Sequence, residues 1–176
     1  MVAKNGKNVV VAFRGTQGDK IVSLRKGLDE GWKDIVADVD YVVMNKKVNQ
    51  LGLDVDLNNH KLLIDFHEKN QFRQADKLVK EVKKTYPDYN VSLTGHSLGG
   101  ALASYSAAVN SVSAVTYNSP SVFGLLPKDM QEDVNKGKYD KQIINCVHPK
   151  DAISSGAFNP YKRHIGSTYY AGFGFG

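Results

Sequence analysis

The chain has 176 residues, of which 41% are hydrophobic and 23% charged, and it carries a formal net charge of +5 at pH 7. These values are ordinary for one globular domain, here residues 1–176, with a single sizeable core. The composition excludes an internal disulfide, because Cys146 is the only cysteine, and no apolar run approaches the roughly 20 residues of a membrane span.

The first predicted element is a β-hairpin, whose strands over residues 2–3 and 9–13 flank an Asn5-Gly6 turn. Its second strand, VVVAF, is wholly apolar, as is typical of a central strand. Residues 17–31 are polar and punctuated by glycines, so they predict a loop with one amphipathic turn. Residues 45–59 predict a loop with one weak strand.

A long amphipathic helix is predicted from about Leu62 to Tyr86, because apolar residues recur there at helical spacing. A buried strand over 91–95 follows, and then a helix that begins at Leu98. The remaining predicted elements are strands at 113–117, 141–147 and 168–171 and a short helix at 127–135. This alternation predicts an α/β fold, with a mostly parallel central sheet covered by helices on both faces.

The strongest candidate for chemistry is the sequence GHSLG, residues 95–99. It is a G-x-S-x-G motif that follows a predicted strand and begins a helix, the order found in the nucleophile elbow of α/β-hydrolases. A turn this sharp holds the serine in strained backbone geometry, so flanking glycines are needed to avoid collisions. We therefore predict that Ser97 is a nucleophile.

Two later residues are the predicted partners of Ser97. A serine hydroxyl needs a base, which is normally a histidine oriented by a carboxylate. Asp151 follows the strand that ends at Val147, and His164 is the only histidine after it, which gives the Ser, Asp, His order of α/β-hydrolases. The other four histidines are better explained as surface, helix or loop residues: His60, His67, His96 and His148.

An oxyanion hole requires two hydrogen-bond donors. The first predicted donor is the backbone N–H of Leu98, directly after the nucleophile. The second is Thr16, which follows Gly15 at the end of the strand VVVAF and offers an N–H and a hydroxyl. The predicted site uses no cofactor and no metal.

Several segments together resemble the class 3 lipases, the family that contains fungal triacylglycerol lipases and plant acyl hydrolases. They are VVVAFRGT, WKDIVADVDYVV, NVSLTGHSLGGALA, VTYNSPSVFG, VHPKDAIS and RHIGSTYYAG. The resemblance runs from about Val9 to Tyr170 and implies the α/β-hydrolase fold and hydrolysis of carboxylic esters. The site residues it implies are the triad Ser97, Asp151 and His164 and the oxyanion donors Thr16 and Leu98.

The resemblance also implies a lid between Thr16 and Trp32. Apolar residues within 17–31 would then contact a lipid surface, and the mild positive charge of the chain suits an anionic one. Only eight residues precede Val9, so we expect a member of the family that is trimmed at the N-terminus. The stretch LLIDFHE stands where the family commonly has V-H-x-G-F.

We therefore expect a serine carboxylic ester hydrolase, which acts as a lipase, esterase or phospholipase on an acyl ester or lipid and does not bind nucleic acid. Two other functions stay open: an acyltransferase or thioesterase with the same triad, and a catalytically silent binding or structural module. The first ten residues lack a signal-peptide profile. A cytoplasmic location, release without a signal and a place in a larger particle are all compatible with this, and the sequence leaves the oligomeric state open.

Overall fold

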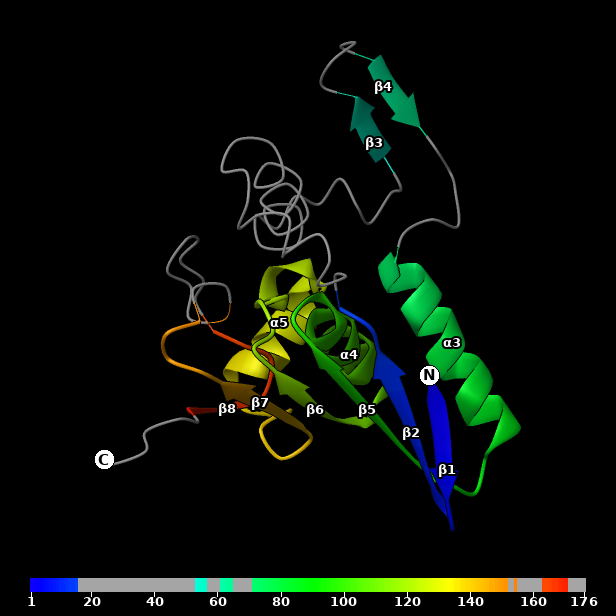
Figure 1. Ribbon diagram of the computed structural model, residues 1–176. Helices are drawn as coiled ribbons and strands as arrows, with labels where there is room; N and C mark the ends of the chain where they lie inside the picture. Colours follow the sequence, from blue (N-terminus) through cyan, green and yellow to red (C-terminus); the bar gives the residue numbers. More distant parts are fainter. Residues whose placement is uncertain (16–52, 57–60, 65–70, 152–153, 155–162, 171–176) are drawn as a thin grey trace, which may run out of the picture.

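The computed structural model describes residues 1–15, 53–56, 61–64, 71–151, 154 and 163–170 of the chain (Figure 1). The strands of its main sheet, in spatial order, are β1 (Val2–Asn5), β2 (Asn8–Phe13), β5 (Asn90–His96), β6 (Ser113–Tyr117), β7 (Ile143–Val147) and β8 (Ser167–Tyr170). The edge strand β1 is antiparallel to β2, and every other neighbouring pair in this sheet is parallel. A second, two-stranded antiparallel sheet pairs β3 (Leu53–Asp56) with β4 (Lys61–Ile64).

Successive side chains of a strand point to opposite faces of the sheet, so alternating burial along the strands shows that one face of the main sheet is covered. Val9 and Val11 of β2 are fully buried, whereas Val10 between them is exposed. The same alternation exposes Val115 and Tyr117 of β6. In the part of the chain that the structure describes, the helical residues of the core pack with Val9 and Val11, so helices cover this one face.

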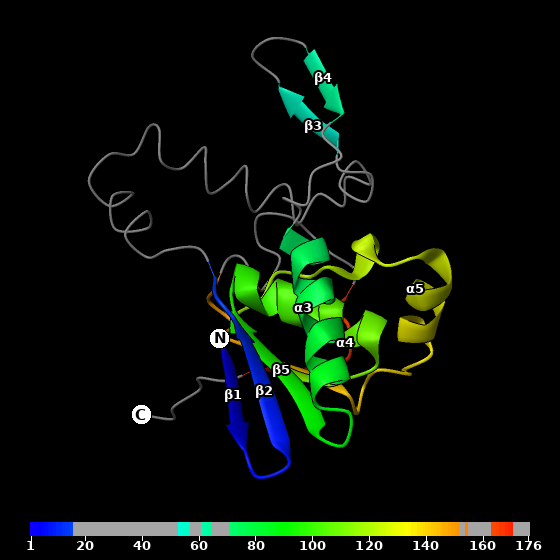
Figure 2. The ribbon, with the colours of Figure 1, turned by 90° about the vertical axis from the view of Figure 1, so that its right-hand side faces the viewer.

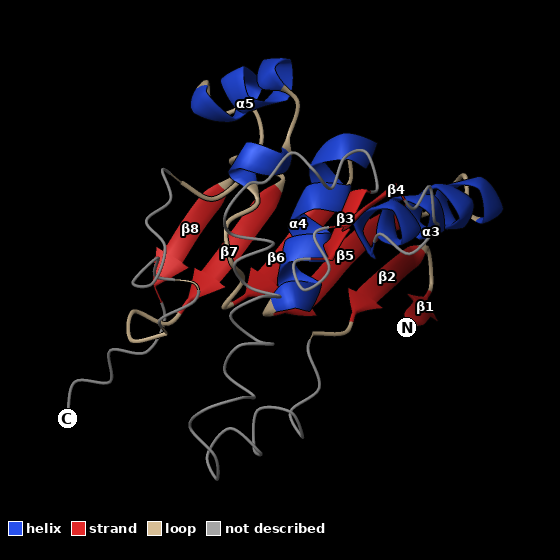
Figure 3. Ribbon diagram, turned by 90° about the horizontal axis from the view of Figure 1, so that it is seen from above, coloured by secondary structure: helices blue, strands red, loops and turns tan. Residues whose placement is uncertain are grey.

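Three α-helices lie within the described residues: α3 (Gln71–Thr85), α4 (Leu98–Asn110) and α5 (Lys128–Asn135). α4 lies on β5 and β6, and its alanines at 101, 103 and 107 are fully buried there. α3 lies beside α4 and packs against it, and its buried residues Val79 and Val82 belong to the same core as Val9 and Val11 of β2 (Figures 2 and 3). None of these described helices is both long and apolar enough to cross a membrane.

The predicted long helix is wrong in its first part. Residues 61–64 form strand β4, and the helix begins at Gln71 rather than near Leu62. The run LLI is apolar at consecutive positions, which fits a strand as well as a helix, and its pairing with β3 selects the strand. Within α3 the buried residues do recur at helical spacing, at Ala75, Val79 and Val82.

The other predicted elements that fall on described residues are confirmed, with shifts of a few residues at their ends. The turn of the first hairpin is at Gly6 and Lys7, one residue later than predicted, and Gly6 has a φ of +56°, where glycine is favoured. β8 begins one residue before the predicted start. The segment 17–31, predicted as a loop or lid, lies outside the described residues.

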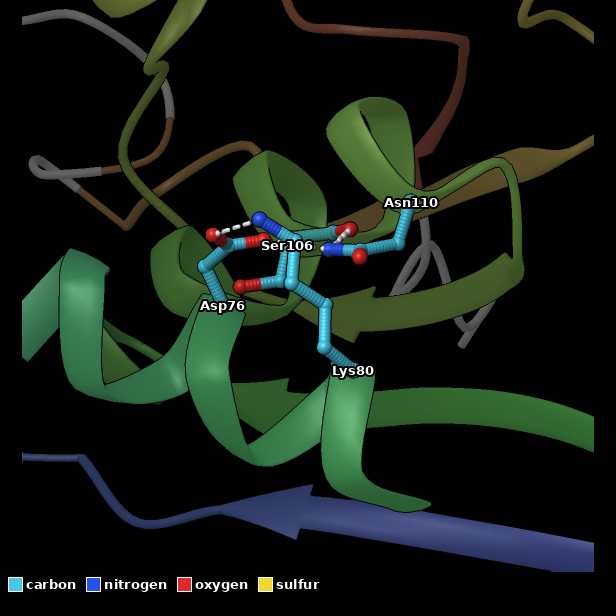
Figure 4. A network of polar contacts seen from close by, with 4 residues as sticks. All are labelled: Asp76, Lys80, Ser106 and Asn110. Atoms are coloured by element: carbon cyan, nitrogen blue, oxygen red, sulfur yellow. Dashed lines mark hydrogen bonds and ion pairs between the residues drawn. The ribbon is translucent and has the colours of Figure 1, made fainter. Parts of the chain in front are cut away.

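A polar cluster joins the C-terminal end of α4 to α3 (Figure 4). The amide Nδ2 of Asn110 donates to Asp76 Oδ1 at 2.8 Å and to the carbonyl oxygen of Ser106 at 2.9 Å. On the solvent side, Lys80 Nζ donates to Asp76 Oδ2 at 2.6 Å. The asparagine is buried, so its amide depends on these partners in place of water.

Substituting Asn110→Leu should lower the free energy of unfolding by about 1–3 kcal/mol, because the side chain is buried and two hydrogen bonds are lost. Urea denaturation measures the change. The matched control is Lys80→Met, which removes the other partner of Asp76 at an exposed position and should cost less than about 1 kcal/mol. Equal losses of unfolding free energy in the two variants would contradict the claim that the buried hydrogen bonds of Asn110 stabilise the fold more than the exposed ion pair of Lys80.

Candidate active site

Ser97 lies in the turn between β5 and α4 and has an unusual backbone conformation. Its φ is 54° and its ψ is −129°, a region that residues with a side chain rarely adopt. The conformation is held from both sides of the residue. The N–H of Ser97 donates to the carbonyl of Tyr117 at 3.0 Å, and its own carbonyl accepts from the N–H groups of Gly100 and Ala101 at 2.9 and 3.1 Å.

The glycines around Ser97 are required by close backbone contacts. A Cβ at Gly95 would collide with the carbonyl of Gly99, and a Cβ at Gly99 would collide with the carbonyl of Phe13 at the end of β2. A Cβ at Gly100 would lie 2.8 Å from Cβ of Ser119. The helix α4 therefore sits against the ends of its neighbouring strands more closely than side chains would allow, as the elbow motif predicted.

The end of β2 lies beside the elbow. A Cβ at Gly15 would lie 2.6 Å from the carbonyl oxygen of His96 and 3.6 Å from Cβ of Ser97. Thr16, the next residue and a predicted oxyanion donor, lies outside the described residues. Leu98, the other predicted donor, is the first residue of α4, where backbone N–H groups have no partner within the helix and the helix dipole is positive.

Asp151 lies in the turn after β7, as predicted. Its N–H donates to the carbonyl of His148 at 2.9 Å, which closes the turn. Its carboxylate oxygen Oδ1 accepts from both the backbone N–H and the hydroxyl of Ser154, each at 2.8 Å. Ser154 is fully buried, so these two donors hold the Asp151 carboxylate toward the interior.

His164 is buried and also contacts Ser154. Its ring nitrogen Nε2 is 3.2 Å from the carbonyl oxygen of Ser154. A carbonyl only accepts, so this contact is a hydrogen bond when Nε2 carries the ring hydrogen. Burial lowers the pKa of His164 below its ordinary value, and the hydrogen bond to Ser154 opposes this in part.

The structure thus links Asp151 to His164 indirectly, because both contact Ser154, a residue that sequence reasoning missed. The two predicted partners differ in their place on the sheet. Asp151 follows β7 as Ser97 follows β5, whereas His164 precedes β8, which runs parallel to β7. The only signal for Ser154 in the sequence is its position three residues after an aspartate, where a side-chain turn can form.

The remaining histidines behave as expected where they are described. His96 and His148 are exposed, and His148 shapes the turn before Asp151, because its Nδ1 accepts from the N–H of Lys150 at 3.2 Å. His60 and His67 lie outside the described residues. No group of three or more His, Cys, Asp or Glu side chains is placed to hold a metal ion within the described part of the chain.

The chain is similar to known proteins. The family model described as Lipase (class 3) matches residues 10–159. The candidate lipase ATG15 of Candida glabrata is 41% identical over 86 residues, which are 47% of this chain and 17% of that protein. The corresponding protein of Eremothecium gossypii is 44% identical over 57 residues, which are 32% of this chain and 10% of that protein. The chain therefore spans less than a fifth of the length of these relatives.

A solved structure is similar over most of the chain. The Lip2 lipase of Yarrowia lipolytica matches with a TM-score of 0.47 and 22% sequence identity, over 93% of this chain and 56% of that one. The family model covers β3, β4 and all of β5 to β7, with the elbow and Asp151 among its residues. The resemblance seen in the sequence is confirmed: this chain belongs to the class 3 lipase family and has the α/β-hydrolase fold.

Proposed function

We propose that this chain is a serine hydrolase of carboxylic esters, with Ser97 as its nucleophile. The observation that carries the proposal is the strained backbone of Ser97, directly before α4 and beside the end of β2. Such strain persists only where the surrounding structure enforces it, and here four glycines and the carbonyl of Tyr117 do so. Membership of a lipase family supports the same chemistry.

In the proposed mechanism the Ser97 hydroxyl oxygen attacks the ester carbonyl carbon while the neutral ring of His164 accepts the hydroxyl proton. The N–H groups of Leu98 and Thr16 donate to the oxyanion that forms. The imidazolium then returns the proton to the departing alcohol, which leaves an acyl group on Ser97. Water attacks this acyl-enzyme by the same steps and releases the acid. Asp151, through Ser154, keeps the base oriented.

The substrate we propose is an acyl ester of the lipid class. Residues 17–31 would contact the lipid surface, with Ile21, Val22, Leu24 and Leu28 toward it. An acyl-enzyme also serves acyl transfer and thioester cleavage, so the acceptor and the leaving group must be measured. A panel of esters of rising chain length, with and without an added alcohol acceptor, separates hydrolysis from transfer.

The test of the proposal is the early time course with a short-chain nitrophenyl ester. We expect a burst of nitrophenol that is stoichiometric with the protein, followed by slower steady turnover, because an acyl-enzyme accumulates. Intact mass measured during the burst should show one added acyl group, which the Ser97 peptide carries. A catalytically silent module releases no nitrophenol above the background rate, and that result would overturn the proposal.

The pH dependence should report the lowered pKa of His164. Only the neutral ring accepts a proton, so kcat/KM should rise with pH and reach half its plateau below pH 6.5, the ordinary histidine value. The folded state also resists protonation of this ring, so the free energy of unfolding should fall as the pH drops below 6.5. Rates are therefore measured only where circular dichroism shows a folded chain. A midpoint above the ordinary value would contradict the assignment.

A further inference from the structure

We propose that Asn145, in the middle of β7, is a positioning residue for the reaction. It fixes the segment 163–167, which carries His164, against the sheet and against the helix that begins at the elbow. The inference rests on the proposed function, because positioning matters to the reaction only if His164 takes part in it.

The side-chain amide of Asn145 is fully buried, and it both donates and accepts hydrogen bonds. Its Nδ2 donates to the carbonyl oxygens of Ile165 at 2.8 Å and Ser167 at 3.1 Å. Its Oδ1 accepts from the Thr116 hydroxyl at 2.9 Å and the Ser104 hydroxyl at 3.4 Å. One side chain thus joins β6, α4 and the segment that leads into β8.

An asparagine at this buried position destabilises the fold unless its amide forms hydrogen bonds. It occupies a buried position in an otherwise apolar strand, where burial of an amide without partners would cost several kcal/mol. A leucine of similar volume would fill the space without any polar group. What leucine cannot supply is a donor to the two carbonyls that flank Gly166.

The segment is pinned on both sides of His164. The Ser121 hydroxyl donates to the carbonyl of Arg163 at 2.6 Å, and Asn145 holds the carbonyl of Ile165. Gly166 then passes so close to β7 that a Cβ would lie 2.8 Å from Cβ of Ile143. The backbone of His164 therefore has little freedom between its two fixed neighbours.

The same asparagine also reaches the helix that carries the nucleophile. Ser104 is seven residues after Ser97, which is about two turns along α4. The elements that supply the proposed nucleophile and the proposed base therefore meet at Asn145. A shift of about 1 Å in such an arrangement can lower a rate about 100-fold.

The experiment compares Asn145→Leu with Asn110→Leu. Asn110 is a matched control, because it is also a buried asparagine whose Nδ2 donates two hydrogen bonds, but it joins α3 to α4. For Asn145→Leu we expect kcat with a nitrophenyl ester to fall about tenfold or more, while KM changes by less than about twofold. Hydrogen exchange of the amides at 165–170 should become faster. Asn110→Leu should leave kcat unchanged and should speed this exchange less than Asn145→Leu does.

Equal kcat values in the two variants, or unchanged exchange at 165–170, would overturn the inference. Absence of turnover in the unsubstituted chain contradicts the proposed function itself and is seen before any variant is compared. If Asn145→Leu does not fold, Asn145→Asp replaces it, since it keeps the acceptor Oδ1 and loses the amide donor. Its kcat relative to the unsubstituted chain should rise as the pH falls, because a protonated carboxyl regains one donor, and a flat ratio would refute the role.

Discussion

Substitution Ser97→Ala is expected to abolish ester hydrolysis, with a fall in kcat of about 10⁴-fold or more. Alanine has no hydroxyl to attack the carbonyl, so no acyl-enzyme forms. The backbone bonds around residue 97 involve only its N–H and carbonyl groups, and alanine keeps both. The loss should therefore appear in nitrophenyl ester turnover while the urea unfolding curve stays within about 0.5 kcal/mol of the original.

Ser97→Gly is the companion variant, because it removes the strain together with the hydroxyl. Glycine adopts the φ of 54° at this position without steric cost, so this variant should be inactive and about 1 kcal/mol more stable. Residual turnover in either variant near the original rate would show that another group is the nucleophile. A stability loss in Ser97→Gly would show that the elbow is not strained.

Substitution Gly99→Ala is expected to have the largest effect on folding. A Cβ there would lie 2.8 Å from the carbonyl carbon of Arg14 and 2.9 Å from the nitrogen of Gly15, in addition to its collision with the Phe13 carbonyl. All three are backbone atoms near the end of a paired strand, so they cannot move independently. We expect a loss of about 3 kcal/mol in the free energy of unfolding, with a fall in ester turnover because the end of β2 is displaced from the elbow.

Gly6→Ala serves as the comparison, because a side chain at this position would cause backbone strain without a steric collision. Gly6 also has a positive φ, but a Cβ there would meet no atom within 4 Å. Its cost should be about 1 kcal/mol, with no change in kcat. Similar unfolding energies for the two variants would mean that α4 can move away from β2, and that the close contact at Gly99 is not needed.

Much of the fold was predictable because its signals are local. The apolar runs before the elbow and in β7 each fix a strand from a few residues, and the dipeptide Asn5-Gly6 located the first hairpin to within one residue. The failure at β4 has the same origin, because three consecutive apolar residues carry no period that separates a strand from a helix. Their partner strand β3 decides the matter, and strand pairing is a non-local property.

In the candidate site, too, the features marked by a local motif were predictable, and those that depend on distant contacts were not. The strained turn at Ser97 was predictable, since its glycines and the following helix form one continuous motif whose backbone the structure reproduces. The contributions of Ser154 and Asn145 were not predictable from the sequence. Ser154 contacts Asp151 and His164, and His164 is 10 positions away. Asn145 bonds to Ser104, which is 41 positions away. A polar residue inside the apolar run of β7 was the one available sign of Asn145. The catalytic roles of Ser97, Asp151 and His164 and the oxyanion roles of Thr16 and Leu98 stay predictions.

The most direct test of the account is the rate at which a fluorophosphonate probe is captured at Ser97, measured in the unsubstituted chain and in His164→Ala. Mass spectrometry of the peptide that contains Ser97 locates the adduct, and circular dichroism confirms that the variant is folded. We predict capture at Ser97 in the unsubstituted chain and a rate at least about 100-fold lower without the imidazole. Equal rates in the two proteins, or no adduct in the unsubstituted chain, would contradict the claim that His164 activates Ser97.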